Sequence, residues 1–384
     1  MKIFPIIFIF MVLTFTEDCP AQVFSSDDLK IHGFLTQAYA ISDNHQIFGI
    51  PTSGTTDYRS LALQFHYPGP GNLSATLQLA HFRMGQHPSN DFLAPVELDW
   101  AFLQYRINEK MYVRFGKVLM PLGIYNEVRD VGLVLPFYRA PYTPYSEGQY
   151  VSETFNGGLI YVEQQLGEAW SASLDLYAGG WEWLDWWVIQ NPLSGQTDIL
   201  TGRPKIDNGI GLQGWLYSPI EGLRLGISLQ QADIHGGITF QEDNGIAGIG
   251  SQVMRFANLS FDGDFEAWLL RSEMVFLKYN NFPLKGFGYY LQPGLRILSN
   301  TWAYFQYQVM QYWDLPNIAT GEKTSTKFLK DLGVSLKWQL SLNIALKFES
   351  HWTYSKQIED AYANPYSQDL PFTRYAVFSI SNSF

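Results

Sequence analysis

The sequence predicts an all-β fold: a transmembrane, antiparallel up-and-down β-barrel of about 16 strands, with short periplasmic turns and long extracellular loops. Three observations carry this prediction. Apolar and polar side chains alternate along most of the chain, the alternating segments are long enough to cross a bilayer as tilted strands, and the connections alternate between short and long. Only 16% of the 384 residues are charged and 46% are hydrophobic, which excludes a disordered chain.

The segment from Tyr58 to Tyr67 illustrates the alternation. Leu61 and Leu63 share one face, whereas Ser60 and Gln64 lie on the opposite face. Such segments approach the roughly 9 to 11 residues of a tilted membrane strand and exceed the ~5 to 6 usual in soluble sandwiches. We expect strands near residues 30–40, 57–67, 73–83, 96–107, 111–118, 154–163, 169–180, 207–217, 223–231, 252–261, 265–278, 286–298, 301–310, 327–338, 342–354 and 372–384.

The connections give a second signal. Those after even-numbered strands are short and rich in Gly, Pro, Asn, Asp and Ser, as at 68–72 and 299–300, whereas most of the others are long. Residues 119–153 form the longest connection. An even number of strands returns both chain ends to one rim, and the rim with short turns is periplasmic in outer-membrane barrels.

The N-terminus predicts export. Lys2 precedes the apolar stretch Ile3–Phe15, and Cys19-Pro20-Ala21 offers small residues for cleavage before Gln22. We therefore expect a cleaved signal peptide at 1–21 and one barrel domain at 22–384.

The last strand ends on an aromatic residue. Ala376, Phe378, Ile380 and Phe384 share one phase. In this the sequence resembles bacterial outer-membrane porins, whose terminal Phe is the signal read by the barrel-assembly machinery. The resemblance implies the outer membrane of a Gram-negative bacterium, contact with outer-membrane lipid and lipopolysaccharide, and a homotrimer.

Two short motifs narrow the resemblance. Val113–Gly123 is similar to the run that opens the constriction loop in relatives of the phosphate-selective porins O and P, and Ile344–Glu349 is similar to their penultimate strand. The resemblance implies that the third long loop, 119–153, folds into the barrel and narrows it. The lysine and arginine arrays of phosphate preference are not recognised, so that selectivity is not carried over.

Charged side chains opposite the apolar phase must face the lumen, because charges rarely face lipid. The pair Arg271 and Glu273 and the pair Lys347 and Glu349 would either brace the wall as salt bridges or set the field along an aqueous path. Lys117 points toward lipid by strict alternation, so we expect the strand to end near Gly116 or to bulge there. The predicted pore constriction comprises Arg114, Lys117, Glu127, Arg129, Asp130 and Arg139.

A tryptophan-rich run follows the seventh predicted strand. It could form an aromatic girdle at the outer membrane interface, or it could stack sugar rings at a channel mouth as in maltoporin-like channels. The residues concerned are Trp181, Trp183, Trp186 and Trp187.

Composition and motifs limit the function. The net charge of −11 comes without a basic stripe, which argues against nucleic acid as a partner. Catalytic, nucleotide and metal signatures are not found, and we expect no cofactor and no reaction. The sequence therefore predicts a porin that conducts small hydrophilic solutes or ions by passive diffusion. A carbohydrate-selective channel using the tryptophan-rich run and a barrel enzyme remain alternatives.

The signal-peptide prediction is testable by intact-mass measurement of protein purified from outer membranes. We expect a mature chain that begins at Gln22. Retention of Met1–Ala21, or an acyl group on Cys19, would contradict it.

Overall fold

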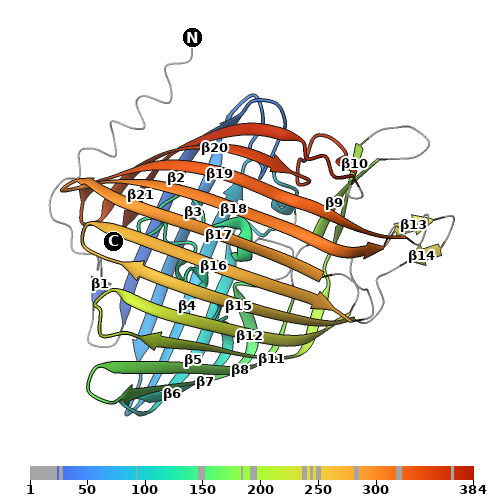
Figure 1. Cartoon of the computed structure of the whole chain (residues 1–384). Helices are drawn as coiled ribbons and strands as arrows, with labels where there is room; N and C mark the ends of the chain where they lie inside the picture. The colour runs from blue at the N-terminus through green and yellow to red at the C-terminus, as the bar shows by residue number, and fades with distance from the viewer. Residues whose placement is uncertain are drawn as a thin grey trace.

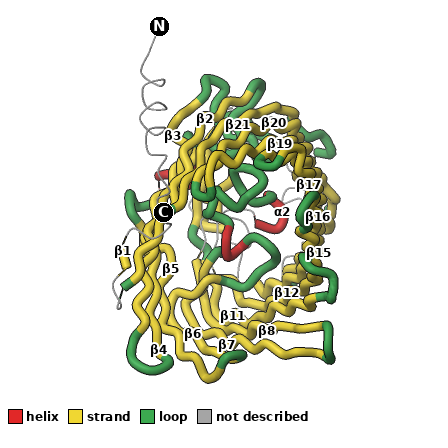
Figure 2. The backbone as a smooth tube through the Cα atoms, turned by 90° about the vertical axis from the view of Figure 1, so that its left-hand side faces the viewer, coloured by secondary structure: helices red, strands yellow, loops and turns green. Residues whose placement is uncertain are grey.

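Sixteen strands close into one barrel in the computed structural model (Figures 1 and 2). The structure describes residues 24–25, 29–91, 93–145, 152–182, 185–190, 197–235, 240–242, 245–247, 252–280, 285–316, 322–364 and 367–384. The barrel strands are β2 (Lys30–Ser42), β3 (Thr55–Pro68), β4 (Leu73–Met84), β5 (Glu97–Asn108), β6 (Met111–Leu119), β7 (Thr154–Leu166), β8 (Trp170–Glu182), β11 (Lys205–Tyr217), β12 (Leu223–His235), β15 (Gln252–Asp264), β16 (Trp268–Tyr279), β17 (Lys285–Leu298), β18 (Thr301–Pro316), β19 (Lys323–Ser341), β20 (Ile344–Ser355) and β21 (Phe372–Ser383).

Each barrel strand pairs antiparallel with its neighbours around the barrel, and β2 pairs with β21 to close the ring. The predicted fold class and number of strands are therefore confirmed. Two hairpins extend long connections, β9 (Asp185–Gln190) with β10 (Thr197–Gly202) and β13 (Phe240–Glu242) with β14 (Gly245–Ala247). The short strand β1 (Phe24–Ser25) pairs only with the start of β2. No helix in the described part of the chain is long and apolar enough to cross a membrane.

The outer face of the barrel is apolar. Leu, Ile, Val and Phe side chains of the outward phase are exposed on nearly every strand, as lipid contact requires. Exposed aromatic residues mark both rims, Tyr67 and Trp338 near the short turns and Tyr39 and Trp352 near the long loops. Such paired girdles lie at the two membrane interfaces.

Short turns join the strands at one rim. They span only 69–72, 109–110, 167–169, 218–222, 265–267, 299–300 and 342–343. Gly222 has a φ of +81°, and a Cβ there would lie 2.0 Å from the Asp264 carbonyl oxygen, so this turn requires glycine. The long connections share the opposite, extracellular rim.

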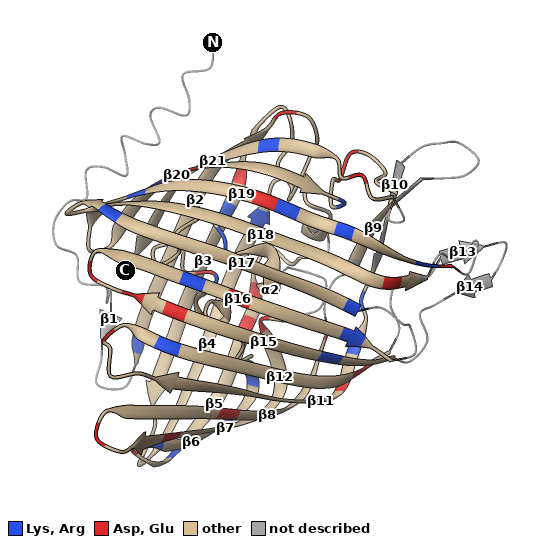
Figure 3. Cartoon of the chain, in the orientation of Figure 1, with Lys and Arg blue, Asp and Glu red and all other residues tan. Residues whose placement is uncertain are grey.

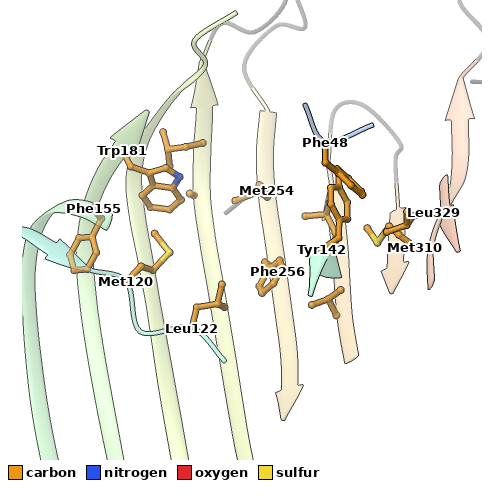
Figure 4. Packing of buried hydrophobic residues seen from close by; sticks show 14 of the residues in the cluster. Phe48, Met120, Leu122, Tyr142, Phe155, Trp181, Met254, Phe256, Met310 and Leu329 are labelled. Carbon is orange, nitrogen blue, oxygen red and sulfur yellow. The ribbon is translucent and has the colours of Figure 1, made fainter. Parts of the chain in front are cut away.

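The inner phase differs between the two halves of the barrel. Toward the extracellular rim it carries buried apolar side chains such as Met254, Phe256 and Met310. These belong to one core with Phe48 of the first long loop and Leu122 of the third, seen in Figure 4. The inner phase is therefore not polar throughout: the extracellular half of the lumen is packed with apolar residues, and the loops supply part of that packing.

Phe384 closes the seam between the first and last barrel strands. Its amide N–H donates to the Gly33 carbonyl at 2.9 Å, and the Gly33 N–H donates to the Phe384 carbonyl at 2.8 Å. The Phe384 ring covers Gly33, where a Cβ would lie 2.4 Å from it.

Deleting Phe384 should lower the yield of folded barrel several-fold, because the seam and the predicted assembly signal are both lost, whereas Phe384→Tyr should assemble normally. Heat-modifiable gel mobility of outer-membrane fractions measures the folded fraction. Equal folded yields for the deletion and the wild type would contradict this prediction.

Candidate functional site

The connection from β6 to β7 enters the barrel. Its two ends are joined where the Met120 N–H donates to the Glu153 carbonyl at 2.8 Å. The Asn126 side-chain amide donates to the Met120 carbonyl at 2.8 Å and to that of Glu153 at 3.2 Å. Asn126 begins the 3₁₀ turn η2 (Asn126–Val128), and the helical turn α2 (Tyr142–Tyr145) follows later. We call residues 120–145 the inner loop; Figure 2 shows it inside the ring of strands.

One wall carboxylate anchors the start of the inner loop. Glu273 of β16 is 1% exposed and accepts hydrogen bonds from Asn258 at 2.7 Å, Ser260 at 2.7 Å and the Tyr290 hydroxyl at 2.8 Å. The inner loop adds the Ile124 N–H at 3.2 Å and the Tyr145 hydroxyl. Five donors therefore satisfy the hydrogen-bonding capacity of this carboxylate. The Glu273 side chain is thus held against the inner loop and does not face an aqueous path.

The residue before Ile124 must be small. Gly123 has a φ of +58°, and a Cβ there would lie 2.3 Å from both Glu273 Oε1 and the Tyr145 hydroxyl oxygen. Its N–H donates to Ser228 of β12 at 3.2 Å, and its carbonyl accepts from Gln213 of β11 at 2.9 Å.

A second anchor lies on β19 and β20. The Lys347 ammonium donates to the Gly132 and Phe137 carbonyls, both at 2.8 Å, and Lys337 donates to the Leu133 carbonyl at 2.5 Å. Glu349 accepts the Tyr138 N–H at 2.7 Å. Lys347 is 1% exposed and Glu349 4%, so both charges are matched by groups of the inner loop.

These contacts revise the interpretation of the wall charges. Arg271 pairs with Asp262 at 2.8 Å and donates to the Tyr125 hydroxyl at 3.1 Å, while Tyr125 bonds to Gln292. Of the two interpretations of these wall charges, the first does not hold: Arg271 does not pair with Glu273, nor Lys347 with Glu349. The wall charges instead bind a loop, because a buried ion without partners would cost several kcal/mol.

A chamber of about 600 Å³ lies below the inner loop, toward the periplasmic rim. Arg114 of β6 lines it and donates to Gln104 at 2.9 Å, and its guanidinium lies 4.7 Å from the Phe102 ring centre and 4.6 Å from that of Tyr112. The exposed Glu127 lines its other side. Both predicted residues therefore face this space.

Charges gather where the inner loop meets the wall between β3 and β7. Asp99, Asp130 and Glu153 each place a carboxylate oxygen within 4.8 Å of the others. Oxygen atoms grouped in this way are able to coordinate a divalent cation. Burial, followed by the charges of Asp130 and Asp99, raises the pKa of Glu153 well above its usual range, whereas Arg129 opposes this rise.

Arg129 and Asp130 face different spaces. Asp130 lines the periplasmic chamber, and Arg129 lines a small cavity of about 20 Å³ on the extracellular side, together with Arg139. The peptide between Arg129 and Asp130 therefore separates the two. Arg139 bonds to the Tyr58 hydroxyl, and its guanidinium lies 4.5 Å from the Phe48 ring centre.

The sequence reasoning missed Asp99 and Glu153. In the pairing of β4 with β5, Gln78 faces Trp100 and Leu79 faces Leu98, so Asp99 is the unpaired residue of a bulge. A bulge breaks the alternation on which the inward phase was assigned. Glu153 could have been found from its position, because it closes the loop one residue before β7.

The prediction for Lys117 is wrong. The ladder continues through Lys117, which faces Ala101 on β5 and Asn156 on β7. The residue shares the outward phase of Phe115, and its ammonium donates to the Leu98 carbonyl at 2.7 Å. It lies two residues from the extracellular end of β6, where a charge can reach the membrane interface.

The tryptophan-rich run forms neither an exposed girdle nor an open stacking surface in its described part. Trp181 and Trp186 are each 4% exposed; Trp181 packs in the inner core, and Trp186 lies edge-on to His87 at 5.3 Å. Trp183 and the Trp187 side chain lie outside the described residues.

Extracellular loops cover the mouth above the inner loop. Glu359 accepts the Gly49 N–H at 2.9 Å and the Gln46 side-chain amide at 2.9 Å, and Ile47 bridges to Ile358. Burial raises the pKa of Glu359 to about 7. The first and last long loops are thus joined across the barrel seam.

Comparisons with known proteins support the fold. No family model and no curated protein matches the sequence. The outer-membrane expressed OmpT of Vibrio cholerae is 8% identical, with 94% of this chain and 100% of that chain covered and a TM-score of 0.58. The outer membrane channel DcaP of Acinetobacter baumannii is 10% identical, with 95% of this chain and 100% of that chain covered and a TM-score of 0.56. Salmonella typhi OmpF in complex with daunomycin is 12% identical, with 94% of this chain and 100% of that chain covered and a TM-score of 0.58.

These likenesses, together with the apolar outer band, define the class. The chain has the fold of a porin-like transmembrane barrel. The identities of 8% to 12% establish the fold alone.

The anchoring role of Lys347 is testable. Lys347→Met should lower the free energy of unfolding by about 2–5 kcal/mol, because the buried Gly132 and Phe137 carbonyls lose their charged donor. It should also make the inner loop sensitive to protease. Denaturant titration and limited proteolysis in detergent measure both effects. Lys330→Met, on the outward face of β19, is the matched control, and equal behaviour of the two variants would contradict the anchor.

Proposed function

We propose that this barrel is a narrow passive channel for small hydrophilic solutes and ions, and that it favours cations. The observation that carries the proposal is the charge set at the inner loop, where Asp99, Asp130 and Glu153 face Arg129. This set lies between the periplasmic chamber and the extracellular cavity. Fields there are screened least, because water is scarce.

The sign of the preference follows from the groups present. Three carboxylates outnumber the Arg129 guanidinium. Burial and the charges of Asp130 and Asp99 raise the pKa of Glu153, so the negative charge of this set grows as the pH rises. A permeating cation would therefore be stabilised most at high pH. An anion would meet net repulsion before it reached Arg129.

Phosphate selectivity is not part of the proposal. Lys337 and Lys347, which a phosphate path could use, already donate to carbonyls of the inner loop. Arg114 is the predicted basic residue that lines the chamber.

A second candidate function is a channel for ring-bearing solutes such as sugars. On the inner face of β5 to β7, Trp100 stacks on Phe102 at 5.7 Å and Tyr112 stacks on Tyr161 at 4.6 Å, with Arg114 between Phe102 and Tyr112. Aromatic faces can stack on sugar rings. Block of the conductance by oligosaccharides would favour this candidate.

We propose no catalytic role. His87 lies 2.6 Å from the Ser89 hydroxyl oxygen and 3.8 Å from Glu359, a grouping that resembles a hydrolytic triad in composition. All three residues are buried, and both Glu359 oxygens accept the Gly49 N–H. The group therefore fits a role in joining loops.

We also propose a homotrimer. The structure of a trimer form of Vibrio cholerae OmpT has been solved, and that protein is 8% identical to this chain, with a TM-score of 0.56 over 93% of this chain and 99% of that chain.

Charge changes at the inner loop should move ion selectivity in opposite directions. Arg129→Glu should increase the cation preference, and Glu153→Gln should reduce it, each by about twofold or more in permeability ratio. Arg203→Glu, at an exposed position after β10, should change it little. Zero-current potentials in planar bilayers under a KCl gradient measure the ratios. Equal potentials for all three variants would place the selective region elsewhere.

The same preference should depend on pH. Because the Glu153 pKa is raised, its carboxyl takes up a proton at a higher pH than an exposed Glu does, so cation preference should fall as the pH is lowered from 8 to 5. The Glu153→Gln variant should lose most of this dependence. An unchanged pH profile in that variant would contradict the assignment.

A further inference from the structure

Three basic side chains form a row on the outer face. Arg255 on β15 faces Lys278 on β16, and Lys278 faces Lys285 on β17 in the registered pairs of the sheet. All three are exposed. Like charges directly opposite each other destabilise a sheet unless they are neutralised. Lys285 has Asp314 at 2.7 Å, and Arg255 donates to the Gln231 side chain at 2.9 Å. Lys278 has no ion-pair partner among the residues that the structure describes.

The row lies at the extracellular rim. β15 begins at Gln252 after a long loop, and at the same rim β16 ends at Tyr279 and β17 begins at Lys285. Figure 3 shows basic residues gathered near these strand ends. Just below, Phe276 and Phe287 lie 5.1 Å apart, and Phe287 lies 6.1 Å from Trp313. An aromatic belt of this kind marks the headgroup level, so the row lies at the depth of lipid phosphates.

An apolar groove of about 970 Å³ runs from this row across the outer wall toward β6. Arg255, Lys278 and Gln231 line its polar end, and exposed apolar side chains such as Leu176, Ile210 and Leu229 line the rest. Small residues deepen it, including Gly158, Ala178 and Ala257. The groove therefore joins a cationic end to a long apolar floor.

We propose that this groove binds a phosphorylated lipid of the outer leaflet, lipopolysaccharide, with a phosphate at Arg255 and Lys278 and an acyl chain along the apolar floor. Charge complementarity selects this occupant. A guanidinium and an ammonium side by side form strong charge-assisted hydrogen bonds to phosphate. A second copy of the chain would bring its own apolar outer face, which offers nothing to neutralise the row.

The test uses folded, full-length barrel in detergent, titrated with bis-phosphorylated lipid A and followed by native mass spectrometry. The variant R255E/K278E should weaken lipid A binding by about tenfold or more. R255K/K278R keeps both charges and should retain binding. Lys110→Glu, an exposed cation in a periplasmic turn, is the matched control.

Two further arms separate the sources of affinity. Ala257→Trp should fill the groove and weaken binding of lipid A while heat-modifiable mobility stays normal. Millimolar inorganic phosphate should not displace the lipid, since it lacks the acyl chain. Equal binding by wild type and R255E/K278E would overturn the proposal. A change of oligomeric state in R255E/K278E without loss of lipid binding would also overturn it, because the face would then be a subunit interface.

Discussion

Buried charged side chains of the barrel wall hold a loop inside the barrel, and most other features of the lumen depend on this interaction. Glu273 binds the start of the inner loop, and Lys347 and Glu349 bind its middle, in each case through backbone groups that would otherwise be unsatisfied. Backbone groups are suitable partners because each offers one fixed donor or acceptor. The wall and the loop thus satisfy each other, and neither would tolerate removal of the other.

Fixing the loop divides the lumen into unlike halves. Above it, Phe48, Leu122 and Met254 belong to an apolar core that the extracellular loops complete. Below it, a chamber lined by polar groups opens toward the periplasm. In the proposed channel, a solute would meet a charged boundary at Arg129 and Asp130, where the two halves join. The rigid wall therefore determines the position of the charges that the proposed selectivity depends on.

The strands were predictable because the physical signal repeats. A strand with one face in lipid must place an apolar residue at every second position, and β12 shows this from Leu223 to Leu229. The loop's location followed only from resemblance, and its contacts did not follow at all. Glu273 and Lys347 look the same in sequence whether they face water or a carbonyl group. Asp99 was not predicted as a site residue because a bulge shifts the inward and outward phase locally. Lys117 was predicted to point inward, but it points outward, because charged side chains are tolerated on the outer face near the end of a strand.

Covalent trapping tests most directly whether the inner loop lies against the wall. A Cβ at Gly132 would lie 3.2 Å from the Thr36 Cβ, close to the roughly 3.5–4.5 Å of a disulfide. In a Cys19→Ser background, Gly132→Cys with Thr36→Cys should therefore form a disulfide in intact outer membranes, seen by mass and by non-reducing gel. Gly132→Cys with Ser228→Cys, on β12, should not. Two results together would contradict an inner loop held by the wall: the first pair does not form a crosslink, and the Gly132→Cys thiol reacts with a membrane-impermeant maleimide added from outside.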